Sequence, residues 1–560
     1  MEYDNAEAIV ALYQQAKTLR YPCEEDWRKA AAYVLPAHYQ SWTTEGRADT
    51  GQTGLEAARR VNYDSTGMLS LPKYTAILER LATPSGQQFV QVRAKSKELR
   101  RVKRVQAFYD NLTDTLRDMR MHPAARFRTT ASEVYQGMGV YGNGPLYIGK
   151  RSRITGERGG DGIKYVACQL KNCFVLVDDE GNIVGFFRRI WLNLRQFKSK
   201  FPDVSPPRAF STGAKGPTEN KFEEFVHYVC MRDAKEYDPT ALDRRRHPWV
   251  GQYVCVKDKA MIGEQSGYTS MPYKMPRTAT MPDNAYGYSP AMLALASLGG
   301  ASAMKKANLK IGNRAADPTI LTPDDVTFNG NVDIRPGRVN PGGVNADGRR
   351  LFQILESGDF RVAEALLQDE RMDTRDAFFV TLFDILSQTP EMTATEVMER
   401  VAERIALLSP TLARLQSEFL GPMVDREVDM AFELGMINED DIPPEVLEDG
   451  GEFETIYTSP MAKNIYAEDI SGFMRSFEMA SRAAEVQQDP SPLDHFNMDT
   501  AIPEISEHLS VPARWLRSPD EIAQMREQRS EQAQQDQLVN NAAGLGAAAN
   551  ALGNAGGGQP

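Results

Sequence analysis

The sequence predicts an α+β protein that is mainly α-helical, and three observations carry this prediction. Helical patterns are long, and the longest runs over residues 393–435, where apolar residues recur every three or four positions. Short apolar runs bounded by turn residues fill residues 145–191 and return at 222–231 and 249–256, which predicts a small antiparallel β region. A loop-rich stretch over residues 315–350 separates two further helical segments.

The helix expected at 393–435 has recognisable ends. Thr393 precedes Glu396 by three positions, as in a capping box, and Gly435 fits a helix stop. Pro410 and Pro422 each remove a backbone donor inside the pattern, so we expect kinks near both. The apolar face that must be buried consists of Val397, Val401, Ile405, Leu408, Leu412, Leu415 and Phe419. Pattern alone fits a core helix of an ordinary globular domain equally well.

Composition narrows the class of protein. A chain of 560 residues is long for one core and predicts several domains or an elongated protomer. Hydrophobic residues make up 41% and charged residues 25%, which describes a chain able to bury a core. The net charge of −11 argues against a dedicated nucleic-acid binder. Five scattered cysteines and an acidic N-terminus without a signal-peptide pattern predict synthesis in the cytoplasm.

The two ends of the chain also read as helical. Residues 4–35 predict two helices separated at Tyr21-Pro22, and residues 54–82 a third helix bent by Pro72. Residues 93–104 carry seven Lys or Arg against one Glu and lead into an amphipathic helix. A solvated or subunit-facing surface is favoured there over a nucleic-acid patch, because no aromatic residues interleave. Another helix is expected near 461–487, and the uncharged stretch after Asp536 reads as disordered.

Motifs for catalysis and for cofactor or metal binding are weak. Residues 137–142 match G-x-G-x-x-G, but a helix precedes them and a strand follows, so a helix-ending glycine turn is favoured over a dinucleotide loop. Cys168 and Cys173 have no second pair at zinc-ligand spacing and read as strand residues. No H-E-x-x-H, G-x-S-x-G or Walker pattern occurs. The sequence therefore predicts no enzyme, no cofactor and no metal site.

A basic stripe lies on the Ala-rich helix that starts after Ser289-Pro290. Lys306, Lys310 and Arg314 follow at steps of four and share one face, with Lys305 beside them. In a ring-shaped assembly the stripe would either line a channel and touch DNA phosphates without sequence preference, or face a neighbour's acids and the outside. The sequence leaves both readings open.

Several motifs together resemble the portal, or head-to-tail connector, proteins of short-tailed double-stranded DNA bacteriophages. Each motif is weak alone, but their order extends over some four hundred residues. The matching segments are VNYDSTGMLSLPKYTAILERLATPSGQQFVQVRA (61–94), YQGMGVYGNGPLYI (135–148), Met271-Pro272-Tyr273, Arg277, Tyr286-Gly287-Tyr288-Ser289-Pro290, the segment from Pro318 to Pro341-Gly342, and the T-A-x-E start at Thr393.

The resemblance implies a portal-protein fold assembled as a dodecameric ring around a DNA channel. It divides the chain into an N-terminal wing region (1–288), a first stem helix (289–314), a clip (315–356), a second stem helix (357–386), a tunnel loop (387–392), a long kinked wing helix (393–436), a wing return and crown (437–515), and a C-terminal helix remnant and disordered tail (516–560).

The resemblance also implies site residues. The stripe Lys305, Lys306, Lys310 and Arg314 would line the DNA channel. The tunnel loop would contain Ser387, Gln388, Thr389 and Pro390. The clip would offer a docking surface with Pro318, Pro323, Arg335, Pro336, Arg338 and Pro341.

The implied partners are further copies of the chain, a terminase packaging motor, the major capsid or scaffolding protein, tail adaptor proteins and double-stranded DNA passing through the channel. The implied location is the portal vertex of the virion capsid. Two alternatives remain: another phage head-tail adaptor or ring protein, and a DNA-processing enzyme of the packaging machinery. The missing Walker motif argues against the enzyme, and the chain length argues against the adaptor.

Overall fold

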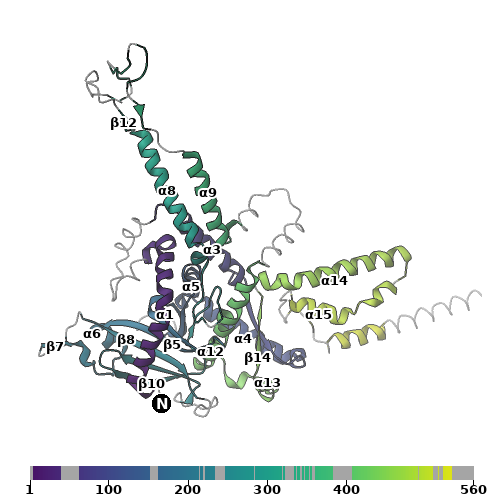
Figure 1. The fold of residues 1–560 in the computed structure, drawn as a ribbon. Coiled ribbons are helices and arrows are strands. Elements are labelled where there is room, and N and C mark those ends of the chain that lie inside the picture. The colour runs from purple at the N-terminus through teal and green to yellow at the C-terminus, as the bar shows by residue number, and fades with distance from the viewer. Residues whose placement is uncertain are drawn as a thin grey trace, which may run out of the picture. The chain divides into compact units, whose positions relative to one another are not determined.

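The computed structural model describes most of the chain (Figure 1). The described residues are 4–38, 62–151, 162–212, 215–217, 221–233, 246–282, 284–317, 319–321, 360–381, 407–458, 460–489, 491–508 and 521–532, with short pieces between 333 and 355 and single positions at 515 and 517. The chain divides into two units. The first combines Met1–Gly86 with Met119–Met430, and the second combines Gln87–Asp118 with Ala431–Pro560.

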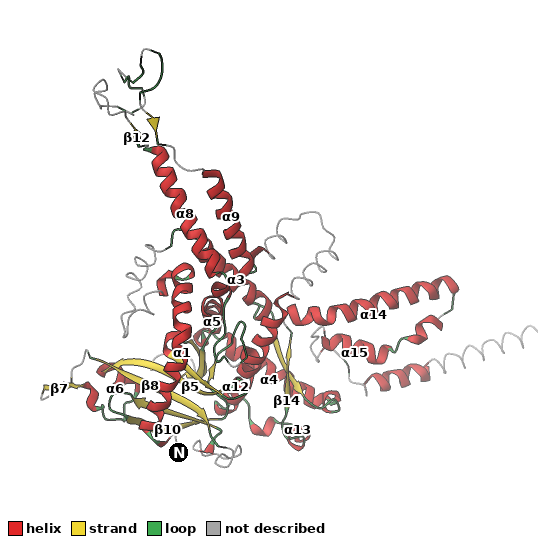
Figure 2. Cartoon of the chain, in the orientation of Figure 1, coloured by secondary structure: helices red, strands yellow, loops and turns green. Residues whose placement is uncertain are grey.

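Two antiparallel sheets form the β part of the first unit (Figure 2). The larger has the order β10-β9-β8-β5-β4, and the smaller has the order β11-β2-β3. Their strands are β2 (Leu146–Arg151), β3 (Gly162–Ala167), β4 (Cys173–Val177), β5 (Ile183–Asn193), β8 (Phe222–Met231), β9 (Trp249–Cys255), β10 (Ala260–Tyr268) and β11 (Tyr273–Lys274). The expected β region is therefore present, and β10 extends it.

Helix α1 (Ala6–Val34) covers one face of the larger sheet. Ile9 and Tyr13 are buried against Phe174 and Phe187 of the strands, and the Tyr13 ring meets the Phe174 ring edge to face at 5.0 Å. The expectation of two helices separated at Tyr21-Pro22 is wrong, because α1 continues through Pro22. Burial of Tyr13 before the proline and of Trp27 after it outweighs the lost backbone bond, which costs about 3 kcal/mol.

The remaining helices of the first unit surround the sheet region. They are α3 (Thr66–Ala82), α5 (Phe127–Tyr141), α6 (Leu194–Lys200), α7 (Pro290–Leu293), α8 (Leu295–Ala316) and α9 (Phe360–Ala377). Helix α3 begins at Thr66, later than the expected residue 54, since residues 62–65 are not helical. Asp64 explains this start, because its carboxylate accepts the Thr66 N–H at 2.8 Å. Residues 54–61 lie outside the described residues.

The long helix expected at 393–435 is described from residue 407. It continues through Pro410 into a π-helical segment, Gln416–Leu420, and then into α12 (Gly421–Glu433). Pro422 has no N–H to donate to the carbonyl four residues back, and a π segment with i to i+5 bonding stands immediately before it. The expected disturbance near Pro422 thus takes this form. Leu408, Leu412 and Phe419 are buried, as the apolar stripe predicts.

The second unit has its own small framework. Strand β1 (Val90–Ala94) pairs antiparallel with β14 (Phe453–Tyr457), although their sequence positions differ by more than 350 residues. Its helices are α4 (Lys103–Met121), which extends just past the unit boundary, α13 (Pro444–Glu448), α14 (Pro460–Gln487) and α15 (Met498–His508). The helices expected after Lys103 and near residue 461 are confirmed. The acids of this unit partly pair with the basic run, as between Lys95 and Glu452 at 2.7 Å.

Candidate functional site

The candidate functional site is the pair of helices α8 and α9 together with the junction at its base. The two helices lie side by side and lead to the loop-rich residues near β12 (Ile320–Leu321), which pairs with β13 (Gln353–Ile354) (Figure 1). The expected order of helix, loop-rich excursion and returning helix is therefore present in the described residues.

Small side chains let α8 and α9 approach closely. A Cβ added at Gly300 would lie 2.8 Å from a carboxylate oxygen of Glu370, so the glycine makes room for that acid. Eight residues further along α8, buried Asn308 donates its side-chain amide to Glu364 at 3.2 Å. These two contacts fix which turns of α9 lie opposite which turns of α8.

The segment before α3 ties the pair to the rest of its unit. Asp64 accepts two hydrogen bonds from the Arg371 guanidinium on α9, at 2.6 and 2.9 Å. Burial disfavours ionisation of Asp64, but hydrogen bonds from Thr66 and from Arg371 outweigh it and lower the pKa of the carboxyl. On the other side, the Tyr63 N–H donates to Ser302 of α8 at 3.0 Å. Both helices are thus anchored at their base.

Two glycine-containing motifs interlock where the first helix of the pair begins. The N–H of Gly287 donates to the buried Asn143 side chain at 2.9 Å, and Asn143 donates back to the Gly287 carbonyl at 3.2 Å. Gly142 ends α5 with a φ of 74°, and a Cβ there would lie 2.5 Å from the Gly287 oxygen. Ser289 caps α7 by accepting the Met292 N–H at 3.0 Å.

This interlock settles the role of the G-x-G-x-x-G match. Gly137 and Gly139 lie inside α5, and a Cβ at Gly139 would lie 2.7 Å from Leu71 of α3. The glycines therefore serve helix packing and a helix end, as expected, and form no phosphate-binding loop. Cys168 and Cys173 are buried free thiols. No group of residues suited to hold a metal ion occurs among the described residues.

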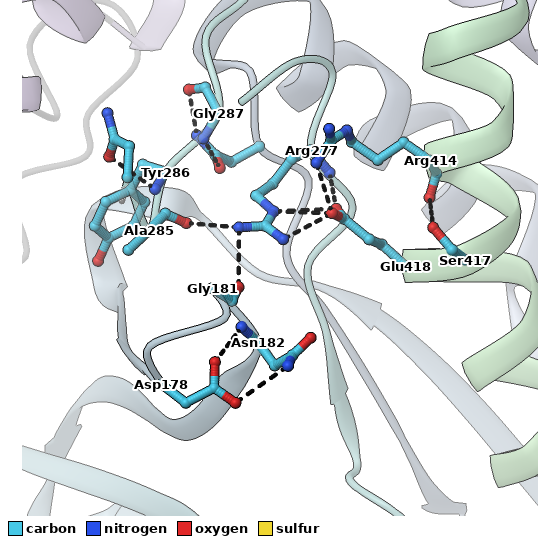
Figure 3. Close-up of polar contacts among 12 residues, drawn as sticks. Asp178, Gly181, Asn182, Arg277, Ala285, Tyr286, Gly287, Arg414, Ser417 and Glu418 are labelled. Atoms are coloured by element: carbon cyan, nitrogen blue, oxygen red, sulfur yellow. Dashed lines mark hydrogen bonds and ion pairs between the residues drawn. The ribbon is translucent and has the colours of Figure 1, made fainter. Parts of the chain in front are cut away.

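Arg277 connects the junction to the long helix through its π segment (Figure 3). Its guanidinium donates to both carboxylate oxygens of Glu418, with a shortest distance of 2.7 Å, and its backbone N–H donates to the same carboxylate at 2.9 Å. The guanidinium also reaches the carbonyls of Gly181 and Ala285 at 3.4 and 3.5 Å. One arginine thus links the β4–β5 turn, the loop before α7 and the long helix.

The four residues of the basic stripe all lie on α8. Lys306, Lys310 and Arg314 are exposed, while Lys305 is half-buried. Lys306 places its ammonium 5.0 Å from the centre of the Tyr63 ring. None of the four makes an ion pair with another residue that the structure describes.

The other expected site residues are only partly described. Ser387, Gln388, Thr389 and Pro390 lie outside the described residues, and so do Pro318, Pro323, Pro336 and Pro341. Of the expected docking residues, Arg335 and Arg338 are described. Both are exposed and contact Asp333, at 2.5 and 3.5 Å.

Sequence reasoning missed a stripe of acids on α9. Asp369, Asp373 and Asp376 are exposed and follow at steps of four and three, so they share one face. The same spacing test that found the basic stripe would have found them. It also missed the partner of Arg277, because Glu418 is 141 residues away in sequence.

Comparison with known proteins identifies the family. The model of the family described as bacteriophage head to tail connecting protein matches residues 6–516. The chain belongs to this family. It is a phage portal connector, and the expectation drawn from the sequence motifs is confirmed. As such it is a component of the virion, in a family whose role is structural. No helix among the described residues is long and apolar enough to cross a membrane.

Two relatives of this connector have portal names. The chain is 25% identical to the portal protein of Salmonella phage epsilon15 over 414 residues, which cover 72% of this chain and 71% of the relative. It is 23% identical to the probable portal protein of Bordetella phage BPP-1 over 553 residues, which cover 97% and 95%.

Solved structures similar to the connector come from gene transfer agent particles. A chain from the virion of the native particle matches with a TM-score of 0.34 and 12% identity, covering 79% of this chain and 94% of that one. A chain from the neck of the empty particle matches with a TM-score of 0.31 and 13% identity, covering 66% and 80%.

Proposed function

We propose that the chain assembles into a dodecameric ring whose central channel carries the double-stranded genome into the head during packaging and out during ejection. The observation that carries this proposal is the family match over residues 6–516. In this proposal α8 and α9 are the stem helices, residues 315–356 form the clip, residues 387–392 form the tunnel loop, and the segment from residue 393 to 436 is the wing helix.

The proposed ring works as a passage and a docking platform. An acidic chain suits a passage, because strong counterion-releasing contacts would hold the phosphates of DNA in place. The terminase motor and later the tail adaptors dock on the clip, while the capsid or scaffolding protein surrounds the wing. The ring sits at the portal vertex of the capsid after synthesis in the host cytoplasm. It carries out no chemical step and needs no cofactor.

The firm junction at the base of the helix pair supports this role. A channel under load from a packaging motor needs its protruding helices held at a fixed angle, and the described residues hold them by the Asp64–Arg371 pair and the Asn143–Gly287 interlock. The loops at the far end of the pair contribute little to a core, and they are free to bind partners.

Negative-stain electron microscopy of the purified full chain tests the proposal. We expect rings with a central opening wide enough for a duplex. Compact monomers at micromolar concentration would overturn it. Filaments or closed rings of a different kind that bind no head or tail component would favour the adaptor alternative.

A further inference from the structure

The helix pair α8–α9 has two outward faces of opposite charge. Asn308 and Gly300 mark the side of α8 that faces α9, and Lys306 and Lys310 lie on the opposite side of the helix at 3.6 residues per turn, with Arg314 close to them. On α9, buried Leu367 and Thr374 mark the inner side. Asp369, Asp373 and Asp376 lie opposite it. One protomer therefore presents a basic face at one side of the pair and an acidic face at the other.

Neither charged face is neutralised within the chain. Among the described residues, no acid forms an ion pair with Lys310 or Arg314, and no base forms one with Asp369, Asp373 or Asp376. Each face also exposes an apolar side chain between its charges, since Leu309 is 49% exposed and Met372 is 59% exposed. Charges flanking an exposed apolar residue are typical of an interface that is completed by another molecule.

We propose that the basic face of α8 docks against the acidic face of α9 in a second copy of this chain. This inference rests on the proposed ring, in which every subunit offers one side to each of its two neighbours. Such a head-to-tail contact needs two different, complementary surfaces on the same chain, and the two sides of the pair carry them. Lys306, Lys310 and Arg314 would then face Asp369, Asp373 and Asp376, with Leu309 beside Met372.

The two stripes are offset along the pair, and the offset constrains the ring. Asn308 lies opposite Glu364. Lys310 lies two residues from Asn308 toward the loop end, and Asp373 lies nine residues from Glu364 toward the base. At 1.5 Å per residue the stripe centres differ by about 16 Å along the axis. Subunits of a closed ring share one height, so the stripes meet only if the helix pair is inclined to the ring axis.

A neighbouring subunit explains the basic stripe better than DNA does. Phosphate contact would account for the three bases of α8 but leaves the matching acids of α9 without a partner. The subunit contact uses both faces and both exposed apolar residues. It also agrees with the acidic chain, because the basic residues are consumed between subunits and do not hold the phosphates.

Charge reversal tests the inference. The basic-to-acidic variant carries Lys306→Glu, Lys310→Glu and Arg314→Glu, and the acidic-to-basic variant carries Asp369→Lys, Asp373→Lys and Asp376→Lys. We expect each variant alone to lose ring assembly at low salt, with association between subunits weakened roughly tenfold to hundredfold, because three attractive pairs become repulsive. Combining all six changes in one chain should restore rings.

Mixing the two variants provides a sharper result. One has acidic faces on both sides of the pair and the other has basic faces on both sides, so only an alternating ring satisfies every interface. We expect equimolar mixtures to form rings with equal numbers of each variant. Recovery upon mixing also shows that both variants are folded.

A cross-link keeps the inference testable if reversal prevents folding. Lys310→Cys with Asp373→Cys, in a chain whose native cysteines are replaced by Ser, should give a ladder of covalent oligomers upon mild oxidation, whereas each single cysteine should give dimers at most. Wild-type rings with unchanged assembly of both reversal variants and no ladder would overturn the inference and leave the proposed ring standing. Absence of rings from the wild-type chain would instead overturn the proposed function. Normal rings of a Lys306→Gln, Lys310→Gln, Arg314→Gln variant that retain less DNA in filled heads would assign the stripe to the channel and overturn the subunit contact.

Discussion

Replacing Glu418 with Gln should loosen the junction between the long helix and the loop that begins the helix pair. The Glu418 carboxylate accepts four hydrogen bonds from Arg277, and the two side chains are only 18% and 12% exposed. Hydrogen bonds to a charged group that is largely removed from water contribute about 1.5–3 kcal/mol each in mutational series, and they are not additive. We therefore expect Glu418→Gln to destabilise the junction by about 2 kcal/mol.

Hydrogen exchange of backbone amides measures this change locally. A loss of about 2 kcal/mol raises the exchange rate of amides that open with the junction by about thirtyfold. We expect this increase in the β4–β5 turn, residues 178–182, whose Gly181 carbonyl accepts from Arg277, and in the π segment Gln416–Leu420. Amides in the centre of α1 should exchange at the wild-type rate.

Arg414→Ala is the matched control. Arg414 donates to the same carboxylate at 3.2 Å, but it is 33% exposed and makes a single contact there, so its loss should cost about 0.5 kcal/mol or less. A double-mutant cycle of Arg277→Met with Glu418→Gln should give a coupling energy of about 1.5 kcal/mol or more. Additive effects, or exchange in Glu418→Gln no faster than in Arg414→Ala, would refute the reasoning.

Three further predictions concern the same unit. Gly142→Ala should destabilise the chain by about 3 kcal/mol or more in denaturant titration, because φ is 74° and the new Cβ would meet the Gly287 carbonyl at 2.5 Å; a loss below 1 kcal/mol would refute this. Asp64→Asn should lower the melting temperature at pH 7. The folded pKa of Asp64 is depressed, so the stabilisation by Arg371 is present above pH 4 and is lost as the pH falls through the depressed pKa; a deficit that persists at pH 2 would contradict it. Deletion of residues 315–352 should leave the circular dichroism melt intact and abolish joining to purified tail components, and normal joining would show that these residues are not the docking surface.

The elements predicted well from sequence are those whose signal is local. The apolar periodicity through Leu408, Leu412 and Phe419 reports burial directly, and these side chains are buried. Ser289-Pro290 carries its own start signal, since the serine caps and the proline occupies the first helical position. The match over residues 137–142 could be read correctly because the order of helix and strand around it excludes a phosphate loop.

The parts missed from sequence depend on distant partners. Pro22 reads as a helix break, and only the burial of Tyr13 and Trp27 keeps α1 continuous. Strands β1 and β14 are short, and each is defined by the other from across the chain. The link between Arg277 and Glu418 likewise has no local signature. Spacing revealed which charges share a face of α8, but only the packing of α9 shows that this face points away from its partner helix.

The central claim, that the chain forms a closed ring, is tested most directly by the mass of the purified assembly. Mass photometry at low salt should give a dominant species of twelve copies of the 62.5 kDa chain, about 750 kDa, and class averages from electron microscopy should show a central opening in that species. A population dominated by the 62.5 kDa monomer, or by a 750 kDa species without an opening, would contradict the account.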